Sequence, residues 1–311
     1  MNGPSNSLSD FEQVTTARER RAPATLVDWG LELRLWVATC VTGLSLFTAR
    51  ALGLALEGTT KSALGVIFFA TLALYNLDGS LDAPRRHALA NAARGHARRR
   101  LHLALTALAG IALLVLVAQL SLRALLLTSG GALACSLYAI PLTFRRRSLT
   151  AKKGRVRLKS LPFLKAPFVG CAVGIAVVWV PLLANDGGAS LLRALALTCA
   201  LSLYCSANAL LFDLPDVGED ERTGVPTLPL RWGLRGTRWA SRALVAAGLV
   251  GSAVFSTLGG AVSHAVGLLC LGAALLAFTE LFHFGTPRRR VALWVDGALL
   301  LPLCFQSLLS I

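Results

Sequence analysis

Apolar residues in this chain occur in long blocks that are separated by polar segments. The blocks have the length of about 17 to 25 residues that a helix needs to cross roughly 30 Å of hydrocarbon. Because lipid offers no partners to backbone N–H and C=O groups, such blocks are expected to be helices. The pattern predicts nine spans, at residues 33–53, 62–78, 102–121, 123–141, 162–184, 191–212, 239–260, 262–282 and 291–310.

Composition supports this interpretation. Of the 311 residues, 55% are hydrophobic and only 15% are charged, whereas a soluble protein carries charge on about a quarter of its residues. The seven cysteines lie inside apolar blocks and have no metal-ligand spacing, so they are expected to be buried apolar side chains. Residues 1–28 are polar and lack the apolar core of a signal peptide. We expect this stretch to be a disordered cytoplasmic tail, and residues 29–311 to be a single polytopic membrane domain.

Positive charge is distributed unequally between the two sides of the predicted membrane. The N-terminal tail and the connections after even-numbered spans hold 25 of the 31 Lys and Arg residues. The opposite side holds only Arg50, Lys61, Arg123 and Arg193. By the positive-inside rule, the N-terminus is cytoplasmic, the C-terminus is outside and the protein belongs in the cell (inner) membrane. The net charge of +15 is thereby explained by topology, and no nucleic-acid partner is expected.

Two acidic clusters follow spans that end on this predicted cytoplasmic side. The first has an i, i+4 spacing and the second an i, i+3, i+7 spacing, so a continuing helix would keep each cluster on one face. Pro215 limits such a continuation in the second cluster, where a fresh helical turn is expected. The clustered residues are Asp78 and Asp82 in the first, and Asp213, Asp216 and Asp220 in the second.

Carboxylates that crowd together at a membrane boundary repel one another and lose hydration, so they require a cation. Hard oxygen ligands suit Mg²⁺, which bridges a few carboxylates to a substrate diphosphate. A single cluster would fit a solvated loop better. Two clusters on the same side, at the ends of spans four apart, favour a Mg²⁺ site held by all five aspartates.

These residues resemble the paired aspartate motifs of the UbiA superfamily of intramembrane prenyltransferases. The second motif is the more specific, because its acids are followed by Gly224, by the run Thr227-Leu228-Pro229 and by Gly233. The first motif is partial, since many members carry an Asn four residues before the first Asp, where this chain has Leu74. The resemblance covers nearly the whole chain. It implies helices around a central cavity, Mg²⁺ dependence and an isoprenoid diphosphate donor.

The two halves of the chain also echo each other, since Tyr75 precedes Asp78 much as Tyr204 and Asn208 precede Asp213. We therefore expect two related four-helix units and a ninth helix, with the site between them. Basic residues near the clusters are candidates to bind the diphosphate: Lys159, Lys165, Arg145, Arg34, Arg86 and Arg222. Arg34 has the alternative of snorkelling to the membrane interface.

Ring faces favour cations, so several aromatic residues are candidates to line the cavity, although each by itself is more typical of ordinary core or interface packing. The predicted lining residues are Tyr75, Tyr138, Tyr204, Asn208 and Trp179. Asp296 and Glu280 are polar groups in apolar surroundings, for which helix–helix or interfacial contacts are favoured over a role at the acceptor.

Three functions remain open from the sequence. The leading one is transfer of a prenyl group to a lipophilic or aromatic acceptor within membrane lipid. A terpene cyclase would ionise the same diphosphate without an acceptor, and the absence of Asn at position 74 favours it slightly. A transporter or scaffold with degenerate acidic clusters is the third, and the nearly complete second motif argues against it.

Overall fold

The computed structural model describes residues 25–87, 92–139, 141–142, 156–157, 164–185, 188–223 and 227–309 of the chain. In these residues the protein is helical, apart from the strands β1 (Pro141–Leu142) and β2 (Val156–Arg157), which pair antiparallel. The first half contains α2 (Leu26–Glu32), α3 (Leu35–Ala51), α4 (Thr59–His87), α5 (Ala92–Val117) and α6 (Leu122–Ala139). The second half contains α7 (Lys165–Ala184), α8 (Leu191–Phe212), α9 (Val217–Thr223), α10 (Leu228–Thr257), α11 (Val262–Leu281), α12 (Arg288–Val291), the π-helical turn η2 (Ala292–Asp296) and α13 (Leu301–Leu309).

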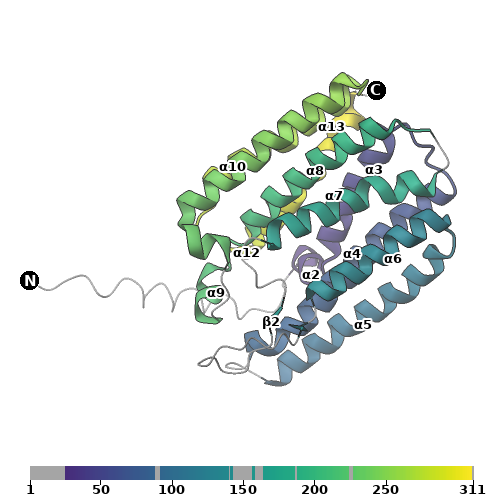
Figure 1. Cartoon of the computed structure of the whole chain (residues 1–311). Coiled ribbons are helices and arrows are strands. Elements are labelled where there is room, and N and C mark those ends of the chain that lie inside the picture. The colour runs from purple at the N-terminus through teal and green to yellow at the C-terminus, as the bar shows by residue number, and fades with distance from the viewer. Residues whose placement is uncertain are drawn as a thin grey trace, which may run out of the picture.

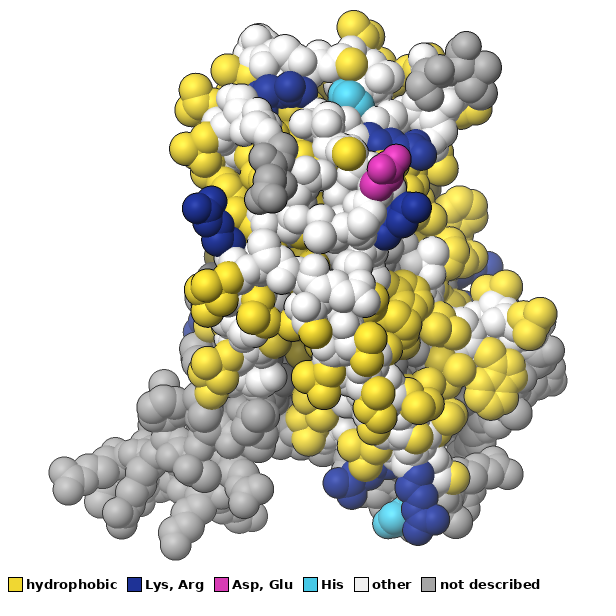
Figure 2. Space-filling model, turned by 90° about the vertical axis from the view of Figure 1, so that its right-hand side faces the viewer, with side chains coloured by type: hydrophobic (Ala, Val, Ile, Leu, Met, Phe, Trp, Pro, Cys, Tyr) yellow, Lys and Arg dark blue, Asp and Glu magenta, His cyan; other side chains and the backbone are white. Residues whose placement is uncertain are grey.

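Seven helical segments in the described part are long and apolar enough to cross a membrane. An eighth is formed if α2 and α3, which are bent by 76° to each other, are counted as one span. The shorter apolar helix α6 covers the remaining predicted span. The prediction of an all-α, multi-pass membrane protein is confirmed. Figure 2 shows the expected surface, with hydrophobic side chains over much of one face.

The two halves meet mainly where α7 packs against α3, α4 and α6. Figure 1 shows α4, α5 and α6 on one side of this centre and α8, α10 and α13 on the other. Close approach of α7 to α8 depends on Gly170 and Gly174: a Cβ atom at Gly170 would lie 2.0 Å from Ser206 Oγ and 2.4 Å from the Ser202 carbonyl oxygen. Small residues at such contacts are typical of membrane helices, where packing replaces the hydrophobic effect.

Several helices break at the end of the bundle that carries the acidic clusters. α8 ends at Phe212 and α9 begins at Val217, as the proline between them predicts. α10 contains Gly233 at a φ of 67°, and it begins earlier than the predicted span at 239. By contrast, α4 runs unbroken to His87, so the first cluster lies on one continuous helix. The breaks place polar loops, instead of straight helices, around this end of the bundle.

Candidate functional site

The second acidic cluster begins at the C-terminal end of α8. Asp213 is the C-cap residue of this helix and is only 2% exposed. Lys165, the first residue of α7, donates a hydrogen bond from Nζ to Asp213 Oδ1 and forms an ion pair with it. The structure thus brings together a predicted metal ligand and a predicted diphosphate-binding residue, which are 48 positions apart.

Asp216 lies in the turn between α8 and α9 and has a different basic partner. Arg288, the first residue of α12, donates a hydrogen bond from Nη1 to Asp216 Oδ1 at 3.1 Å. The ion pair joins the start of the last membrane span to the acidic turn. From the sequence, Arg288 is expected only as one of the positive charges on the predicted cytoplasmic side. Its place in the run Arg288–Arg290 was visible in the sequence, but its partner 72 residues away was not.

The protonation of this cluster is governed by its burial. Burial raises the pKa of Asp213, against the opposing pull of the Lys165 ammonium group. Burial also raises the pKa of Asp220, on α9, to about 6, although Lys165 and Thr227 act in the other direction. Thr227 belongs to the predicted motif after the acids. Raised values mean that the ionised carboxylates are disfavoured here, and another cation would relieve that penalty.

Asp78, the described side chain of the first cluster, lies near the same region. Asp78 is partly buried on α4. The phenol of Tyr138, on α6, is within electrostatic range of both Asp78 and Asp213. Tyr75, one turn before Asp78, lies within electrostatic range of Asp78, Arg34 and Asp296. Tyr138 on α6 is therefore close to Asp78 on α4 and to Asp213 at the end of α8, and Tyr75 is close to Arg34 and to Asp296 of η2.

The hydroxyl of Tyr138 is a buried polar group that lacks a hydrogen-bond partner within the described part of the chain. The ring of Tyr138 stacks on Phe168 at a centroid distance of 4.4 Å. A buried hydroxyl without a partner is costly, so this oxygen marks a place for a bound polar group.

Arg34 occupies the break between α2 and α3. It adopts a left-handed backbone conformation with a φ of 63°, and within the described chain it is the only residue other than glycine that does so. Such a conformation costs of order 1 kcal/mol or more and tends to occur where function requires it. Arg34 is an electrostatic neighbour of Tyr75 and of the buried Asp296. Arg34 therefore lies near Tyr75 and Asp296 at this end of the bundle.

Three predicted lining residues lie in contacts between helices. Tyr204 is fully buried, and its hydroxyl lies 3.1 Å from Ser252 Oγ on α10. Trp179 donates a hydrogen bond to Thr198 Oγ1 at 2.9 Å, which joins α7 to α8. Asn208 donates to the Val295 carbonyl oxygen at 2.9 Å. The polar atoms of these three residues form hydrogen bonds with neighbouring helices. The sequence pattern alone cannot distinguish a residue in such a contact from one that lines the cavity.

Asn76 has a structural position close to the first cluster. It is fully buried, and its Nδ2 donates to the Leu33 and Leu72 carbonyl oxygens at 3.0 and 2.9 Å. Its Oδ1 lies 2.6 Å from Nδ1 of His102 on α5. Asn76 therefore ties α4 to the end of α2 and to α5 and does not substitute for the motif residue that Leu74 replaces.

Some predicted site residues lie outside the described part of the chain. Arg145 and Lys159 belong to segments that are not described, and the side chains of Asp82, Arg86 and Arg222 are likewise outside it. Across the side chains that are described, no three of the types His, Cys, Asp and Glu stand close enough to hold an ion by themselves. The donor chemistry still fits Mg²⁺, because the acids of both clusters offer hard oxygen ligands whose charge is disfavoured without a cation.

Comparison with known proteins identifies the family. Residues 77–298, more than two thirds of the chain, match the UbiA prenyltransferase family. The chain belongs to this family. This UbiA prenyltransferase family enzyme has a fold similar to those of several solved structures. A search of the curated proteins finds no match.

A UbiA homolog from Archaeoglobus fulgidus bound to GPP and Mg²⁺ is 12% identical, with a TM-score of 0.62, and the match covers 90% of this chain and 98% of the homolog. A UbiA homolog from Aeropyrum pernix K1 in its apo form is 18% identical, with a TM-score of 0.64 and coverage of 84% and 94%. A digeranylgeranylglyceryl phosphate synthase is 16% identical, with a TM-score of 0.57 and coverage of 89% and 97%. These matches show that the enzyme has the UbiA fold.

Proposed function

We propose that this UbiA-family enzyme ionises an isoprenoid diphosphate with the help of Mg²⁺ and transfers the prenyl group to a lipophilic acceptor, such as an aromatic ring. The observation that carries the proposal is the position of the Tyr138 phenol, within electrostatic range of Asp78 from the first cluster and of Asp213 from the second. Two acidic clusters that are far apart in sequence thereby border one region. A GPP- and Mg²⁺-bound homolog with the same fold supports the donor class.

Breaking the allylic C–O bond places negative charge on the leaving diphosphate. Groups that stabilise this charge more strongly in the transition state than in the ground state accelerate the reaction. Three basic residues support this proposal: Lys165 is paired with Asp213, Arg288 is paired with Asp216, and Arg34 is an electrostatic neighbour of Tyr75. In this proposal they bind the diphosphate oxygens, and the hydroxyl of Tyr138 donates a hydrogen bond to the same group.

The aspartates are assigned to the metal. Asp78, Asp82, Asp213, Asp216 and Asp220 would hold Mg²⁺ directly or through water. A bound Mg²⁺ neutralises phosphate charge and acts as a Lewis acid on the leaving group. Among the four of these aspartates whose side chains are described, Asp213 is the most buried, at the end of α8. Arg145, Lys159, Arg86 and Arg222 remain predicted contributors to diphosphate binding.

The prenyl cation needs a dry and apolar surrounding, since water would quench it. The stacked rings of Tyr138 and Phe168 and the nearby ring of Tyr75 offer such a surface beside the clusters. Ring faces also stabilise a cation electrostatically. We place the ionised prenyl carbon on this aromatic side of the site and the acceptor in the adjoining lipid-accessible space.

The distribution of positive charge along the chain supports a proposal about the membrane location and orientation of the enzyme. The clusters lie at the end of the bundle that the positive-inside rule assigns to the cytoplasm. A water-soluble diphosphate headgroup would reach them from that side, while its isoprenoid tail and the acceptor remain in membrane lipid. The enzyme is therefore proposed to work in the inner membrane, with its N-terminus in the cytoplasm.

A terpene cyclase is the second candidate, and one observation favours it. Leu74 stands where many family members carry Asn, and the nearby Asn76 is engaged in helix contacts. A cyclase would use the same ionisation and fold the cation onto its own chain.

Product analysis separates these functions. Purified enzyme is incubated with Mg²⁺ and a panel of prenyl diphosphates, with and without a membrane lipid extract, and products are measured by mass spectrometry. Prenylated lipid that forms only with the extract supports the transferase. Cyclic hydrocarbon that forms without the extract supports the cyclase. Absence of diphosphate release with every donor would contradict both and favour a protein with degenerate clusters.

A further inference from the structure

A cavity lies between the end of α11 and the start of the last membrane span. It is half open, has a volume of about 420 Å³ and is lined by Leu281, Phe282, His283, Thr286, Arg290 and Trp294. None of these residues belongs to the acidic clusters. The cavity is nevertheless at the same end of the bundle, because Arg288 beside it contacts Asp216.

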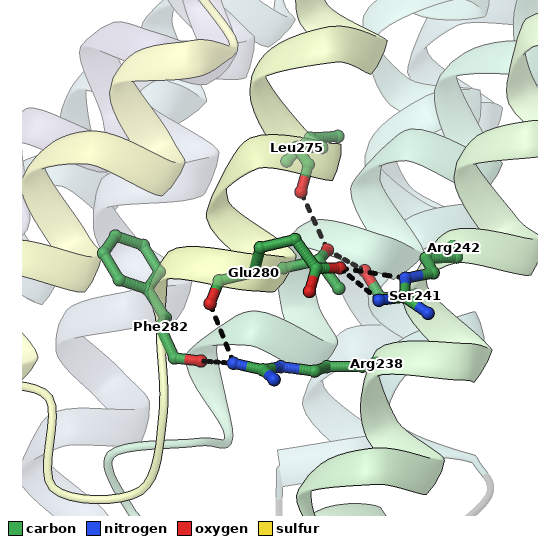
Figure 3. A network of polar contacts seen from close by, with 7 residues as sticks. Arg238, Ser241, Arg242, Leu275, Glu280 and Phe282 are labelled. Carbon is green, nitrogen blue, oxygen red and sulfur yellow. Dashed lines mark hydrogen bonds and ion pairs between the residues drawn. The ribbon is translucent and has the colours of Figure 1, made fainter.

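The wall of this cavity is fixed by hydrogen bonds. The His283 N–H donates to Thr286 Oγ1, and the Thr286 N–H donates back to the His283 carbonyl oxygen, both at 3.0 Å. Arg238, on α10, donates to the carbonyl oxygens of Glu280 and Phe282 at 2.8 and 3.4 Å (Figure 3). The loop is therefore preformed, and a ligand that enters it has little chain ordering to overcome.

Three consecutive arginines at the start of α12 have different surroundings. Arg288 pairs with Asp216 at 3.1 Å, and Arg289 pairs with Asp28 of α2 at 3.0 Å. Arg290 lines the cavity, where none of the lining residues is acidic. Two of the three charges are thus paired within the protein, and Arg290 is the one that lines the cavity.

The nearest acidic residue along α11 is already engaged. Glu280 Oε1 accepts hydrogen bonds from Nε and Nη2 of Arg242 at 2.9 and 2.5 Å, as Figure 3 shows. The local charge of Arg238, Arg242 and Arg290 therefore exceeds that of Glu280. An anion is the complement that this end of α11 requires.

The outer side of the cavity is apolar. Leu281 is 67% exposed and Trp294 is 57% exposed, and in a membrane-spanning chain such side chains face lipid. A tryptophan beside an arginine is typical of the boundary between headgroups and acyl chains. The cavity thus offers a cationic side and a hydrocarbon-facing side to the same ligand.

We propose that this cavity binds an anionic membrane phospholipid, with its phosphodiester headgroup at Arg290 and an acyl chain along Trp294 and Leu281. Basic pockets at the ends of membrane helices bind anionic headgroups in this way. Arg288, which pairs with Asp216, lies in the same segment as the cavity residues. A lipid bound in the cavity would therefore lie beside the acidic site without occupying it.

The test is native mass spectrometry of the full-length protein in detergent, titrated with phosphatidylglycerol or phosphatidylcholine. We expect preferential binding of phosphatidylglycerol, and Arg290→Gln should weaken that binding about five-fold, since one basic residue contributes ~1 kcal/mol to anionic lipid binding. Trp294→Ala should weaken binding of the same lipid by removing the acyl-chain contact.

Arg235→Gln is the matched control, because Arg235 is an exposed arginine of α10 that lines no part of the cavity. It should leave phosphatidylglycerol binding unchanged. An equal loss in the Arg290 and Arg235 variants would overturn the proposal in favour of general surface charge. Equal binding of the two lipids would also overturn it, as would displacement of phosphatidylglycerol by millimolar inorganic phosphate, which would identify a site for free anions.

Discussion

Lys165, the first residue of α7, forms an ion pair with Asp213, the residue that closes α8. The partners differ in exposure, since the Asp213 side chain is 3% exposed and that of Lys165 is 33% exposed. The carboxylate is thus fixed inside the protein, while the ammonium group reaches the open side of the site. Replacing Lys165 and replacing Asp213 should therefore have different effects on stability and on substrate binding.

We predict that Lys165→Met lowers the unfolding free energy by about 1–3 kcal/mol, because it leaves a buried carboxylate without its partner. The double variant Lys165→Met/Asp213→Asn should recover most of this loss. Thermal unfolding in detergent, followed by intrinsic fluorescence, measures both changes. A double variant that is no more stable than the single variant would show that the pair is not the source of the effect.

Neutralising the acidic clusters should abolish turnover. Asp213→Asn and Asp216→Asn each remove a charge that the proposal assigns to Mg²⁺, and we expect diphosphate release to fall about 100-fold or more. An enzyme-coupled pyrophosphate assay with saturating donor and Mg²⁺ measures this. The control is Glu57→Gln, since Glu57 is exposed and precedes α4 at the opposite end of that helix. Unchanged release in both Asp variants would refute the assignment.

Tyr138→Phe separates binding from stability. The variant removes only the buried hydroxyl that lacks a partner among the described residues, so stability should stay equal or rise slightly. Affinity for a prenyl diphosphate should fall about ten-fold, because a hydrogen bond to a charged group is lost. Isothermal titration with a non-hydrolysable donor analogue, alongside an unfolding measurement, checks both parts. Unaltered affinity would place the ligand away from Tyr138.

The contact between α7 and α8 gives a stability prediction outside the site. Gly170→Ala places a methyl group against the Ser202 and Ser206 backbone and should destabilise the protein by about 1–3 kcal/mol. Gly110→Ala is the matched control on α5, where a Cβ atom meets nothing within 4 Å, and it should be neutral or slightly stabilising. Melting temperatures of the two variants should therefore move apart, and equal values would contradict the close packing.

Membrane orientation is tested independently of activity. A reporter tag at the N-terminus should be shielded in intact cells, and a tag at the C-terminus should be accessible from outside, because positive charge is concentrated on one side. The reverse pattern of accessibility would contradict the cytoplasmic assignment of the acidic clusters, while leaving the fold unaffected.

Much of the architecture followed from one-dimensional patterns. Apolar blocks of membrane-spanning length fixed where the helices lie, and Pro215 located the break before α9. Boundaries were less accurate where helices extend into polar loops, as α4 and α10 do. Hydropathy predicts where a helix enters and leaves the lipid, but it does not predict how far the helix continues into water.

The roles of individual side chains were harder to predict. Lys165 was predicted to bind the diphosphate, but its ion pair with Asp213 was not predicted, and Arg288 was not named as a partner of Asp216. Tyr204 and Trp179 are aromatic, as expected of residues that line a cavity for a cation, yet their polar atoms form hydrogen bonds with neighbouring helices. Each of these outcomes depends on which helices are neighbours and how they are rotated.

The sequence by itself determined that this protein is a helical membrane protein and that its acids lie in two clusters on one side, because lipid imposes helix length and backbone pairing on any chain that crosses it. Only the tertiary structure decided that Asp78 and Asp213 border one region, that Lys165 and Arg288 hold the second cluster, and that Arg290 remains for a separate cavity. The physical reason is that contacts between distant helices arise from side-chain packing in three dimensions, which no local pattern encodes.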